Sequence, residues 1–426
     1  MSEHFLVTKE KLKIHIIGAG VSGLIAAKVL EEHGYYPTLI ESSEDVGGRI
    51  KTINNNGYQL DKGFQVLLTE YPKAKKHIDY KALKLQKLVP GACIFKTSKP
   101  AIIGNPIGDI SLLIPTLFSD IGTVADKLKI IKLYLYLRFK SPEKIFLSKE
   151  TKTFIYLQNY GFSEKIINHF FKPFFAGIFL ETELSTSSIM FEFVFKMFAQ
   201  GNVAIPESGM QEIPHQIAKK LTKTNFMFNT EVDKVWEGEI VLKNKEKIKS
   251  DYTIIATEAN TLIDHYNGAS IKWKSCVNFY FETENNSFDK GLIGLVPGNN
   301  TVINNIFFVS GIKSKITGPK ELLSVTVIDS KSFSNADLIE RVEYELKKYC
   351  DINVIRLISQ FNIPKSLPDL EDISYTKRLS EFQISDSIFL AGDHRLNGSL
   401  NAAITSGEMS ALQLINIDNL NYPNYQ

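Results

Sequence analysis

The sequence predicts an α/β protein in which a Rossmann-like dinucleotide-binding domain is interleaved with an α+β domain of helices plus an antiparallel sheet. Three observations support this fold class. A glycine-rich turn joins an apolar strand to a helix near the N-terminus, a long helical region follows, and apolar strand patterns return in the second half. We expect residues 1–70, 201–265 and 380–426 to form the first domain, and residues 71–200 and 266–379 to form the second.

Composition and charge narrow the class of protein. The 426 residues are 44% apolar, which suffices for a large core, and 49 basic residues against 47 acidic ones give no basic surface for nucleic acid. The sequence has no apolar run long enough to span a membrane, and because residues 1–10 lack a long apolar segment and contain acids we expect no secretion signal in them. The three cysteines, Cys93, Cys276 and Cys350, lack disulfide or metal-site spacing. We therefore expect a cytoplasmic protein that holds no metal.

The first element is a strand, residues 12–17, followed by the segment GAGVSG at residues 18–23 and a helix. Gly18 permits the tight turn, Gly20 lets the backbone approach a pyrophosphate, and Gly23 lets the helix pack closely on the strand. The helix N-terminus adds unpaired N–H groups and the positive end of its dipole. This order of elements predicts a dinucleotide site.

A second strand and an acidic residue complete this unit. Gly34 ends the helix, Pro37–Ile40 form the next strand, and Glu41 closes that strand. An acid at this position accepts hydrogen bonds from a ribose diol and would repel a 2′-phosphate. The alternative is a glycine-rich turn that binds no nucleotide.

The region from Tyr71 to Gln200 is predicted to be mostly helical. Lysines alternate with apolar residues over residues 127–140, which is typical of a solvated helix, although peripheral contact with a membrane surface is an alternative. Phenylalanines crowd residues 170–198, where we expect most of them in a helix core and consider that some line a cavity for an apolar ligand.

Strand patterns return from Glu231 to Thr257, and residues 254–257 have the pattern of a buried strand. Turn residues separate four further strand-like runs, Cys276–Phe281, Gly291–Val296, Val302–Val309 and Leu322–Ile328. Their spacing predicts an antiparallel meander.

The remaining elements are a helix, a strand and a terminal helix. Asn335 is predicted to cap the first helix, whose inner face carries Leu338, Val342 and Leu346. A buried strand, residues 388–393, then leads through a glycine-containing turn into the last helix.

Four separated segments resemble the FAD-dependent superfamily of flavin-containing amine oxidases, phytoene desaturases and protoporphyrinogen oxidases. They are GAGVSG with Glu41, GGRI at residues 47–50, DKGFQVL at residues 61–67, and LAGD with NGSLNAAITSG between residues 390 and 407. KPFFAGIFL at residues 172–180 and IPESGMQEIP at residues 205–214 are similar to poorly characterised bacterial members. These segments span nearly the whole chain.

The resemblance implies a FAD-binding domain, a substrate-binding domain and one bound FAD. The glycines of residues 18–23 would hold the pyrophosphate, Glu41 the adenosine ribose, and Gly48 with Arg49 the far side of the pyrophosphate and the ribityl chain. The implied cofactor-binding residues are Gly18, Ala19, Gly20, Val21, Ser22, Gly23, Glu41, Ser42, Gly48, Arg49, Gly63, Phe64, Gln65, Val232, Gly392, Asp393, Ser399, Leu400 and Asn401.

The resemblance places the flavin end of the cofactor near the C-terminal motif. Asp393 would accept a hydrogen bond from a ribityl hydroxyl, and the helix N-terminus at residues 399–402 would face the N1/C2=O edge of the flavin. Val232 matches the position whose backbone meets the adenine, although a core valine is an alternative. The region from Gly392 to Gly407 contains no cysteine, so we expect the FAD to be held non-covalently.

The resemblance also implies an oxidoreductase that oxidises an apolar or amphipathic small molecule by hydride transfer to the flavin. Many amine oxidases of the superfamily carry a lysine near flavin N5. On the matching strand, residues 273–280, our preferred register places Ser275 there, while a slip of one residue would place Lys274. We therefore favour dehydrogenation or desaturation, with amine oxidation as the alternative.

Other functions on this fold are alternatives. Prenyl-protein escort proteins bind lipidated partners without redox chemistry, but such a carrier does not need ribose and ribityl ligands such as Glu41, Arg49 and Asp393. Redox-neutral sugar-nucleotide ring contraction would need an arginine-lined pocket, and arginines are sparse. His394 either reaches the flavin or belongs to a solvated loop. The sequence identifies no catalytic residue, substrate, electron acceptor or oligomeric state.

Overall fold

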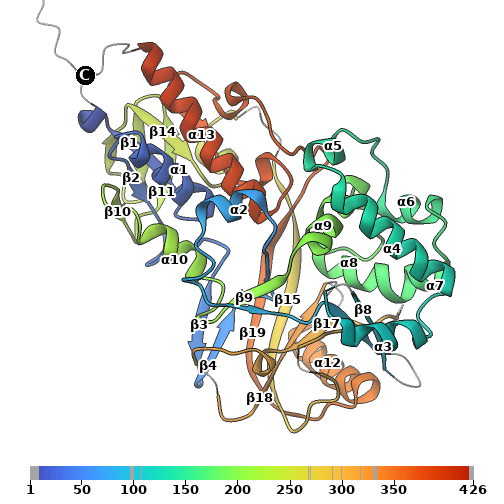
Figure 1. Ribbon diagram of the computed structural model, residues 1–426. Coiled ribbons are helices and arrows are strands. Elements are labelled where there is room, and N and C mark those ends of the chain that lie inside the picture. The colour runs from blue at the N-terminus through green and yellow to red at the C-terminus, as the bar shows by residue number, and fades with distance from the viewer. Residues whose placement is uncertain are drawn as a thin grey trace, which may run out of the picture.

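The computed structural model describes residues 9–95, 100–106, 108–266, 268, 270–289, 291–298, 300–316, 318–328, 330 and 333–421. Two large sheets organise these residues, and a group of helices lies at one end of the elongated molecule (Figure 1). Parallel and antiparallel strands both occur, so the fold mixes helices with both kinds of pairing.

The first sheet has five strands, all paired in parallel. In spatial order they are β10 (Asn225–Met227), β2 (Thr38–Ile40), β1 (Ile14–Ile17), β14 (Tyr252–Ile255) and β20 (Ile388–Leu390). The strands β1, β14 and β20 are buried along their whole length, as expected for a parallel sheet that is covered on both faces, here by helices on one face and by β11 (Val232–Trp236) and β12 (Glu239–Leu242) on the other. This sheet is therefore assembled from segments far apart in the sequence.

Two helices from opposite ends of the chain pack beside this sheet. Helix α1 (Val21–Glu32) lies along α13 (Leu400–Asn421), as Figure 1 shows in dark blue and red. A Cβ atom on Gly407 would lie 2.2 Å from the carbonyl oxygen of Ser22, so only glycine allows this approach. Nearby lies α10 (Glu212–Ala218), and an antiparallel sheet of β11, β12 and β13 (Lys247–Lys249) precedes β14.

The second sheet has seven strands. In spatial order they are β19 (Val354–Asp369), β15 (Lys272–Thr283), β18 (Glu321–Val327), β17 (Ile303–Phe308), β16 (Ile293–Leu295), β7 (Gly91–Ile94) and β8 (Ala101–Gly104). All neighbours are antiparallel except β16 and β7. Helix α12 (Asn335–Cys350) packs its buried Leu338, Val342 and Leu346 in the apolar cluster of this sheet, as predicted.

Two expectations about these elements are wrong. The predicted meander holds only for β16, β17 and β18, because β15 pairs with β18 and β19 rather than with β16. The side chain that caps α12 is Ser334, which accepts a hydrogen bond from the Asp337 N–H, and not Asn335. The region predicted to be mostly helical is so, and it also contributes the short strands β6 (Leu85–Lys87), β7 and β8.

Short strands join the two sheets. These are the hairpin β3 (Thr52–Asn55) and β4 (Tyr58–Asp61), and a small sheet of β5 (Leu67–Leu68), β9 (Val203–Pro206) and β6. The division of the chain into two interleaved domains stays a prediction.

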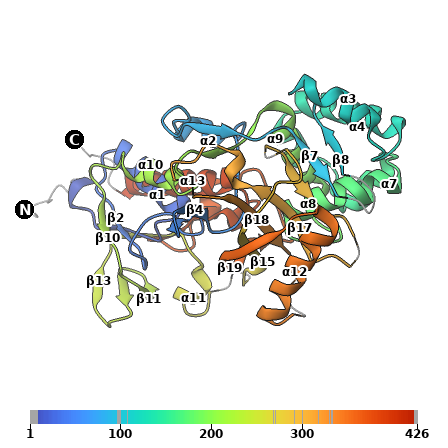
Figure 2. The same ribbon diagram turned by 90° about the horizontal axis from the view of Figure 1, so that it is seen from below.

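The remaining helices are α2 (Pro72–His77), α3 (Leu113–Phe118), α4 (Val124–Phe139), α5 (Pro142–Phe146), α6 (Thr153–Asn159), α7 (Glu164–Ile166), α8 (Lys172–Phe179), α9 (Ser188–Gln200) and α11 (Ala259–Leu262). Helices α3 to α9 gather at the end of the molecule opposite the parallel sheet (Figures 1 and 2). Within the described residues, no helix is long and apolar enough to cross a membrane. The rings of α8 and α9 pack on each other, with Phe175 and Phe191 4.7 Å apart, so the phenylalanine-rich segments mostly form core.

Candidate cofactor and substrate site

The glycine turn between β1 and α1 has the geometry that a bound phosphate group needs. Gly18 has a φ of +101°, which favours glycine, and a Cβ atom on Gly23 would lie only 2.0 Å from the Gly18 carbonyl oxygen. At Gly20, which immediately precedes α1, a Cβ atom would meet no described atom within 4 Å. Gly18 and Gly23 are therefore needed for the turn itself, whereas Gly20 leaves space in front of a helix N-terminus.

Glu41 is fixed directly against this turn. Its buried carboxylate accepts hydrogen bonds from the Ala19 N–H at 2.8 Å through Oε2, and from the Ser43 N–H at 2.9 Å and the Ser43 hydroxyl at 2.7 Å through Oε1. The hydroxyl of Ser42 donates to Oε1 at 3.3 Å. Among the described residues Oε2 accepts a single hydrogen bond, so it keeps a lone pair for a ribose hydroxyl.

The segment that leads to Val232 lies beside Glu41. The Glu41 N–H donates to the Met227 carbonyl, and the Thr230 N–H donates to the Glu41 carbonyl, both at 2.9 Å. The Val232 side chain packs in the apolar cluster that contains Ile40. Its side chain is thus core, while its backbone lies near the acid.

A second glycine turn touches the first. The Gly47 N–H donates to the Ala19 carbonyl at 2.9 Å, and a Cβ atom on Gly48 would lie 3.2 Å from the Gly20 Cα. Gly48 also has a φ of +59°. The two turns therefore meet at Gly20, where bulk on either side would fill the space before α1.

Arg49 continues this line of contacts to Asp393, which is distant in sequence. The Arg49 Nη2 lies 2.5 Å from the Asp393 Oδ1, Nη1 donates to the Ser366 carbonyl at 3.1 Å, and the guanidinium lies 5.1 Å from the Trp273 ring centroid. Burial by itself would raise the pKa of Asp393, but the adjacent guanidinium lowers it below its usual range. Asp393 is therefore a buried carboxylate, and Arg49 pairs with it although the Arg49 side chain keeps 40% of its surface accessible.

The C-terminal motif turns at Gly392, whose φ is +139°, and whose N–H donates to the Ser406 hydroxyl at 2.9 Å. Ser399 caps α13, because its hydroxyl accepts the Ala402 N–H at 3.0 Å. Leu400 begins this helix.

Two side chains near this motif, Asn401 and His394, are held by neighbouring parts of the protein. The buried Asn401 accepts the Lys73 N–H at 2.9 Å and so anchors the start of α2. Burial lowers the pKa of His394, whose ring lies so close to Gly392 that a Cβ there would be 2.2 Å from its Cε1. His394 is thus a residue packed in the turn.

The segment Gly63-Phe64-Gln65 lies between the two sheets. A Cβ atom on Gly63 would be 2.8 Å from the Ile363 Cδ1, and the rings of Phe64 and Phe307 lie 5.3 Å apart. The Gln65 amide donates to the Arg49 carbonyl at 3.1 Å. These residues connect the Arg49 region with the seven-stranded sheet.

Two adjoining pockets lie on the side of the seven-stranded sheet. The larger has a volume of about 680 Å³ and is lined by apolar side chains such as Tyr58, Leu322 and Ile355 together with Lys320 and Glu321. The smaller includes Asp61, Gly63, Phe64, Gln65 and Tyr280, and it shares Gln59, Val309 and Ser314 with the larger. None of the phenylalanines between residues 170 and 198 lines either pocket, so the walls expected from that segment come from other residues.

Asp61 is a half-buried acid in the smaller pocket. Its Oδ1 accepts the Thr52 hydroxyl at 2.5 Å and the Met210 N–H at 2.9 Å. Burial raises the pKa of Asp61 from 3.8 to about 6, against the effect of these hydrogen bonds.

The start of β15 contributes Trp273, which no sequence signal marked as a site residue. Its ring lies under Arg49 and its Nε1 donates to Glu258 at 3.1 Å. Next in the strand, the Lys274 Nζ lies 3.4 Å from the Thr186 Oγ1 and 3.5 Å from the Asp369 Oδ1. In the described part of the chain, no cluster of three His, Cys, Asp or Glu side chains could hold a metal ion.

Comparison with known proteins gives a family match across most of the chain. The family model of flavin-containing amine oxidoreductases matches residues 21–415. Protoporphyrinogen oxidase 2 of Arabidopsis thaliana is 23% identical over 182 residues, which are 42% of this chain and 34% of that protein. The 4,4′-diapolycopen-4-al dehydrogenase of Metabacillus indicus is 39% identical over 57 residues, 13% of this chain and 12% of that protein. The chain thus spans about a third or less of these relatives.

Solved structures share the whole fold at low identity. An oxidoreductase from Methanosarcina mazei aligns with a TM-score of 0.71 and 15% identity over 94% of this chain and 100% of its own. A putative protoporphyrinogen oxidase from an Exiguobacterium species has a TM-score of 0.68 and 17% identity over 95% and 99% of the two chains. Putrescine oxidase bound to putrescine has a TM-score of 0.65 and 14% identity over 95% and 99%.

Proposed function

We propose a reaction for this chain from the premise that it belongs to the flavin-containing amine oxidoreductase family and is a FAD-dependent oxidoreductase. FAD, when bound, supplies the acceptor for two electrons. The reaction we propose is the dehydrogenation or desaturation of an apolar or amphipathic small molecule, carried out by a non-covalently bound FAD in a Rossmann-like domain.

The cofactor path that we propose follows the observed contacts. FAD would extend from Glu41 at the ribose, past Gly20 and Gly48 at the pyrophosphate, to Asp393 and the N-terminus of α13. The space beside Gly20 and the lone pair of Glu41 Oε2 support this path. Because Arg49 and Asp393 already form an ion pair, Arg49 would act there by holding the Asp393 carboxylate charged and oriented.

The single observation that carries the proposed reaction type is the direction of three successive side chains on β15. Trp273 faces Arg49, while Lys274 extends to Thr186 and Asp369. Alternation along the strand would return Ser275 to the side of Trp273, at a point where the pairing of β15 with β19 is irregular, between Lys274 and Cys276. This supports a serine, rather than a lysine, on the face that looks toward the Arg49–Asp393 pair, as in our preferred register.

The two adjoining pockets support an amphipathic substrate. Their shared residues join the larger pocket to the Gly63-Phe64-Gln65 segment, whose Gln65 contacts Arg49. Apolar walls would hold a carbon skeleton, while Lys320 and Glu321 would meet a polar end. A cytoplasmic location and the absence of a nucleic-acid partner remain our predictions.

The proposal is tested by anaerobic reduction of the FAD-loaded protein. We expect cyclic or isoprenoid-like hydrocarbons with a polar end to bleach the flavin absorbance, and polyamines to leave it unchanged. Lys274→Met should not greatly slow the reduction, because positioning and exclusion of water would suffice. Rapid reduction by primary amines, together with a large loss of that rate in Lys274→Met, would instead favour amine oxidation. A chain that FAD cannot reconstitute would favour the non-redox carrier.

A further inference from the structure

Apolar side chains are exposed along one whole face of α4 and continue onto α3. On α4 they recur at intervals of three or four residues, as Val124, Leu128, Ile131, Leu135 and Phe139. The neighbouring exposed residues are Ile110, Leu113, Ile114, Leu117, Phe118 and, after α5, Leu147. We call this set the α3–α4 apolar face. It includes the strongly exposed Phe118 and Phe139, which keep 80% and 83% of their surface accessible.

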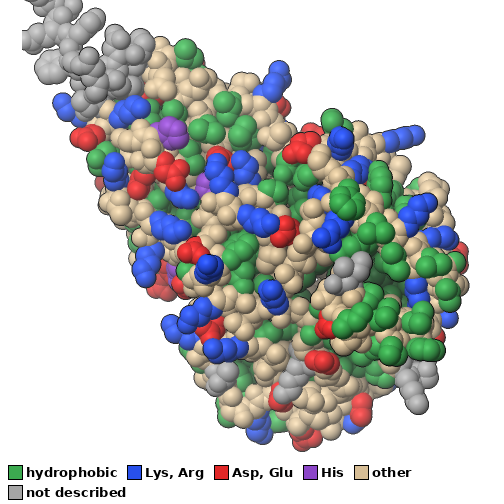
Figure 3. All heavy atoms as spheres, viewed as in Figure 1, with side chains coloured by type: hydrophobic (Ala, Val, Ile, Leu, Met, Phe, Trp, Pro, Cys, Tyr) green, Lys and Arg blue, Asp and Glu red, His purple; other side chains and the backbone are tan. Residues whose placement is uncertain are grey.

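Helix α4 therefore has two apolar sides. Leu133, Tyr134 and Leu137 are buried against the molecule, while the exposed set lies on the other side. A solvated helix normally carries one apolar stripe, and α4 carries a second one that is exposed. Figure 3 shows hydrophobic side chains gathered over this end of the molecule. Contiguous exposed apolar surface of this kind marks an interaction site.

The charge around this face points to the kind of partner. Exposed basic side chains border it at Lys132, Arg138, Lys144, Lys149 and Lys152. Residues 109–152 contain eight lysines and arginines against five acids, of which Asp126 is buried in the N-terminal cap of α4, which leaves Asp109, Asp120, Glu143 and Glu150. The chain as a whole is nearly neutral, so positive charge is concentrated here. Apolar side chains bordered by lysines match the interface of a membrane with anionic headgroups.

We propose that the α3–α4 apolar face docks on the surface of a lipid bilayer that contains anionic lipids. Leu128, Phe118 and Phe139 would enter the boundary of the acyl chains, and the lysines would contact headgroups. The face lies at the opposite end of the molecule from the parallel sheet, so docking would leave that sheet free (Figures 1 and 2). This inference is independent of the proposed reaction, since it does not depend on the substrate.

The first test is flotation of the full FAD-loaded chain with vesicles. We expect strong binding to equal parts of phosphatidylcholine and phosphatidylglycerol, and much weaker binding to phosphatidylcholine alone. The variant Phe118→Ser/Phe139→Ser should bind about a hundredfold more weakly, because two large apolar side chains no longer leave water. The matched variant Trp236→Ser/Leu420→Ser removes apolar residues that are exposed elsewhere and should bind normally. Flavin content and melting temperature should not change in either variant.

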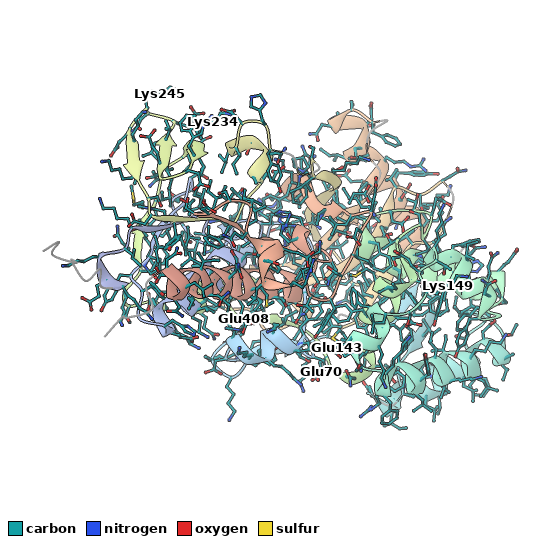
Figure 4. All side chains as sticks on the ribbon, turned by 90° about the horizontal axis from the view of Figure 1, so that it is seen from above. Glu70, Glu143, Lys149, Lys234, Lys245 and Glu408 are labelled. Atoms are coloured by element: carbon teal, nitrogen blue, oxygen red, sulfur yellow. The ribbon has the colours of Figure 1, made fainter. Side chains whose placement is uncertain are left out.

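The second test concerns charge. Lys132→Gln/Lys149→Gln should weaken binding to the anionic vesicles about tenfold or more, because each lysine near a charged membrane adds to the attraction. Lys234→Gln/Lys245→Gln makes the same change in net charge at the far end of the molecule and should have little effect; Figure 4 shows Lys149 at one end, and Lys234 and Lys245 at the other. High salt should also release the wild-type chain.

Three results would overturn the proposal. The first is that the wild-type chain fails to float with anionic vesicles. The second is that both control variants lose as much binding as the variants of the α3–α4 apolar face. The third is that sedimentation shows a dimer for the wild type and a monomer for Phe118→Ser/Phe139→Ser. A second copy of the chain, and not a membrane, would then cover the α3–α4 apolar face.

Discussion

The substitution Gly20→Val separates cofactor binding from folding at the glycine turn. Gly20 has φ and ψ of −70° and 174°, which any residue adopts, and a Cβ atom there meets no described atom within 4 Å. The apoprotein should therefore fold as stably as the wild type or gain up to about 1 kcal/mol, because a glycine is replaced in a compatible conformation. The branched side chain would, however, occupy the place of the pyrophosphate, so FAD binding should be lost.

Gly23→Ala is the matched contrast on the same turn. A Cβ atom there would lie 2.0 Å from the Gly18 carbonyl oxygen, so α1 must move away from β1. Overpacking of this kind costs about 1–3 kcal/mol, against a gain of about 1 kcal/mol in helix propensity. We expect a net loss of up to about 2 kcal/mol in the free energy of unfolding of the apoprotein.

The assay pairs urea unfolding of the apoprotein with FAD titration of the same samples. Gly20→Val should keep the unfolding midpoint and lose FAD, whereas Gly23→Ala should lose stability. Full FAD content in purified Gly20→Val would refute our assignment of the turn, and equal destabilisation by both substitutions would refute the geometric distinction between the two glycines.

Three further predictions concern other groups. Glu41→Gln should weaken FAD binding by roughly 1–2 kcal/mol in a fluorescence titration, since a neutral amide replaces a charged acceptor; unchanged affinity would remove Glu41 from the site. Acid precipitation should release all FAD into the supernatant, and flavin in the pellet would contradict non-covalent binding. The folded-state pKa of Asp61, about 6, exceeds its ordinary 3.8. The wild type should therefore lose up to about 3 kcal/mol of unfolding free energy as the pH rises from about 4 to 7, and Asp61→Asn should lack this loss. If urea unfolding gives the same pH dependence for both proteins, Asp61 is not the group responsible.

The local elements around the first turn could be predicted because short-range rules determine them. Gly18, Gly20 and Gly23 follow an apolar strand and open a helix, and Glu41 follows at the end of the next strand. Each of these signals depends on neighbouring residues, which the sequence displays directly.

Long-range pairing could not be predicted in this way. The partner of β15 is β18, and no turn residue encodes this, because three other elements stand between them in the sequence. Strand β19 was not predicted at all, since it contains Pro364 and Pro368 and many of its side chains are exposed or half-buried. The residues of β19 therefore do not show the alternating apolar pattern that predicts a strand.

The candidate site has the same limit. Arg49 and Asp393 were each proposed to contact the cofactor, but their ion pair and the packing of Arg49 on Trp273 require the folded chain. Likewise, the apolar residues of α4 lie on two sides of the helix, and periodicity cannot tell which side faces water.

The most direct test of the central claim is the ratio of flavin to protein after reconstitution with FAD and gel filtration. A visible flavin spectrum with one FAD per chain is expected, because the contacts from Glu41 through Gly20 to Asp393 describe one extended site. A colourless protein that elutes free of FAD, although folded by circular dichroism, would contradict the account.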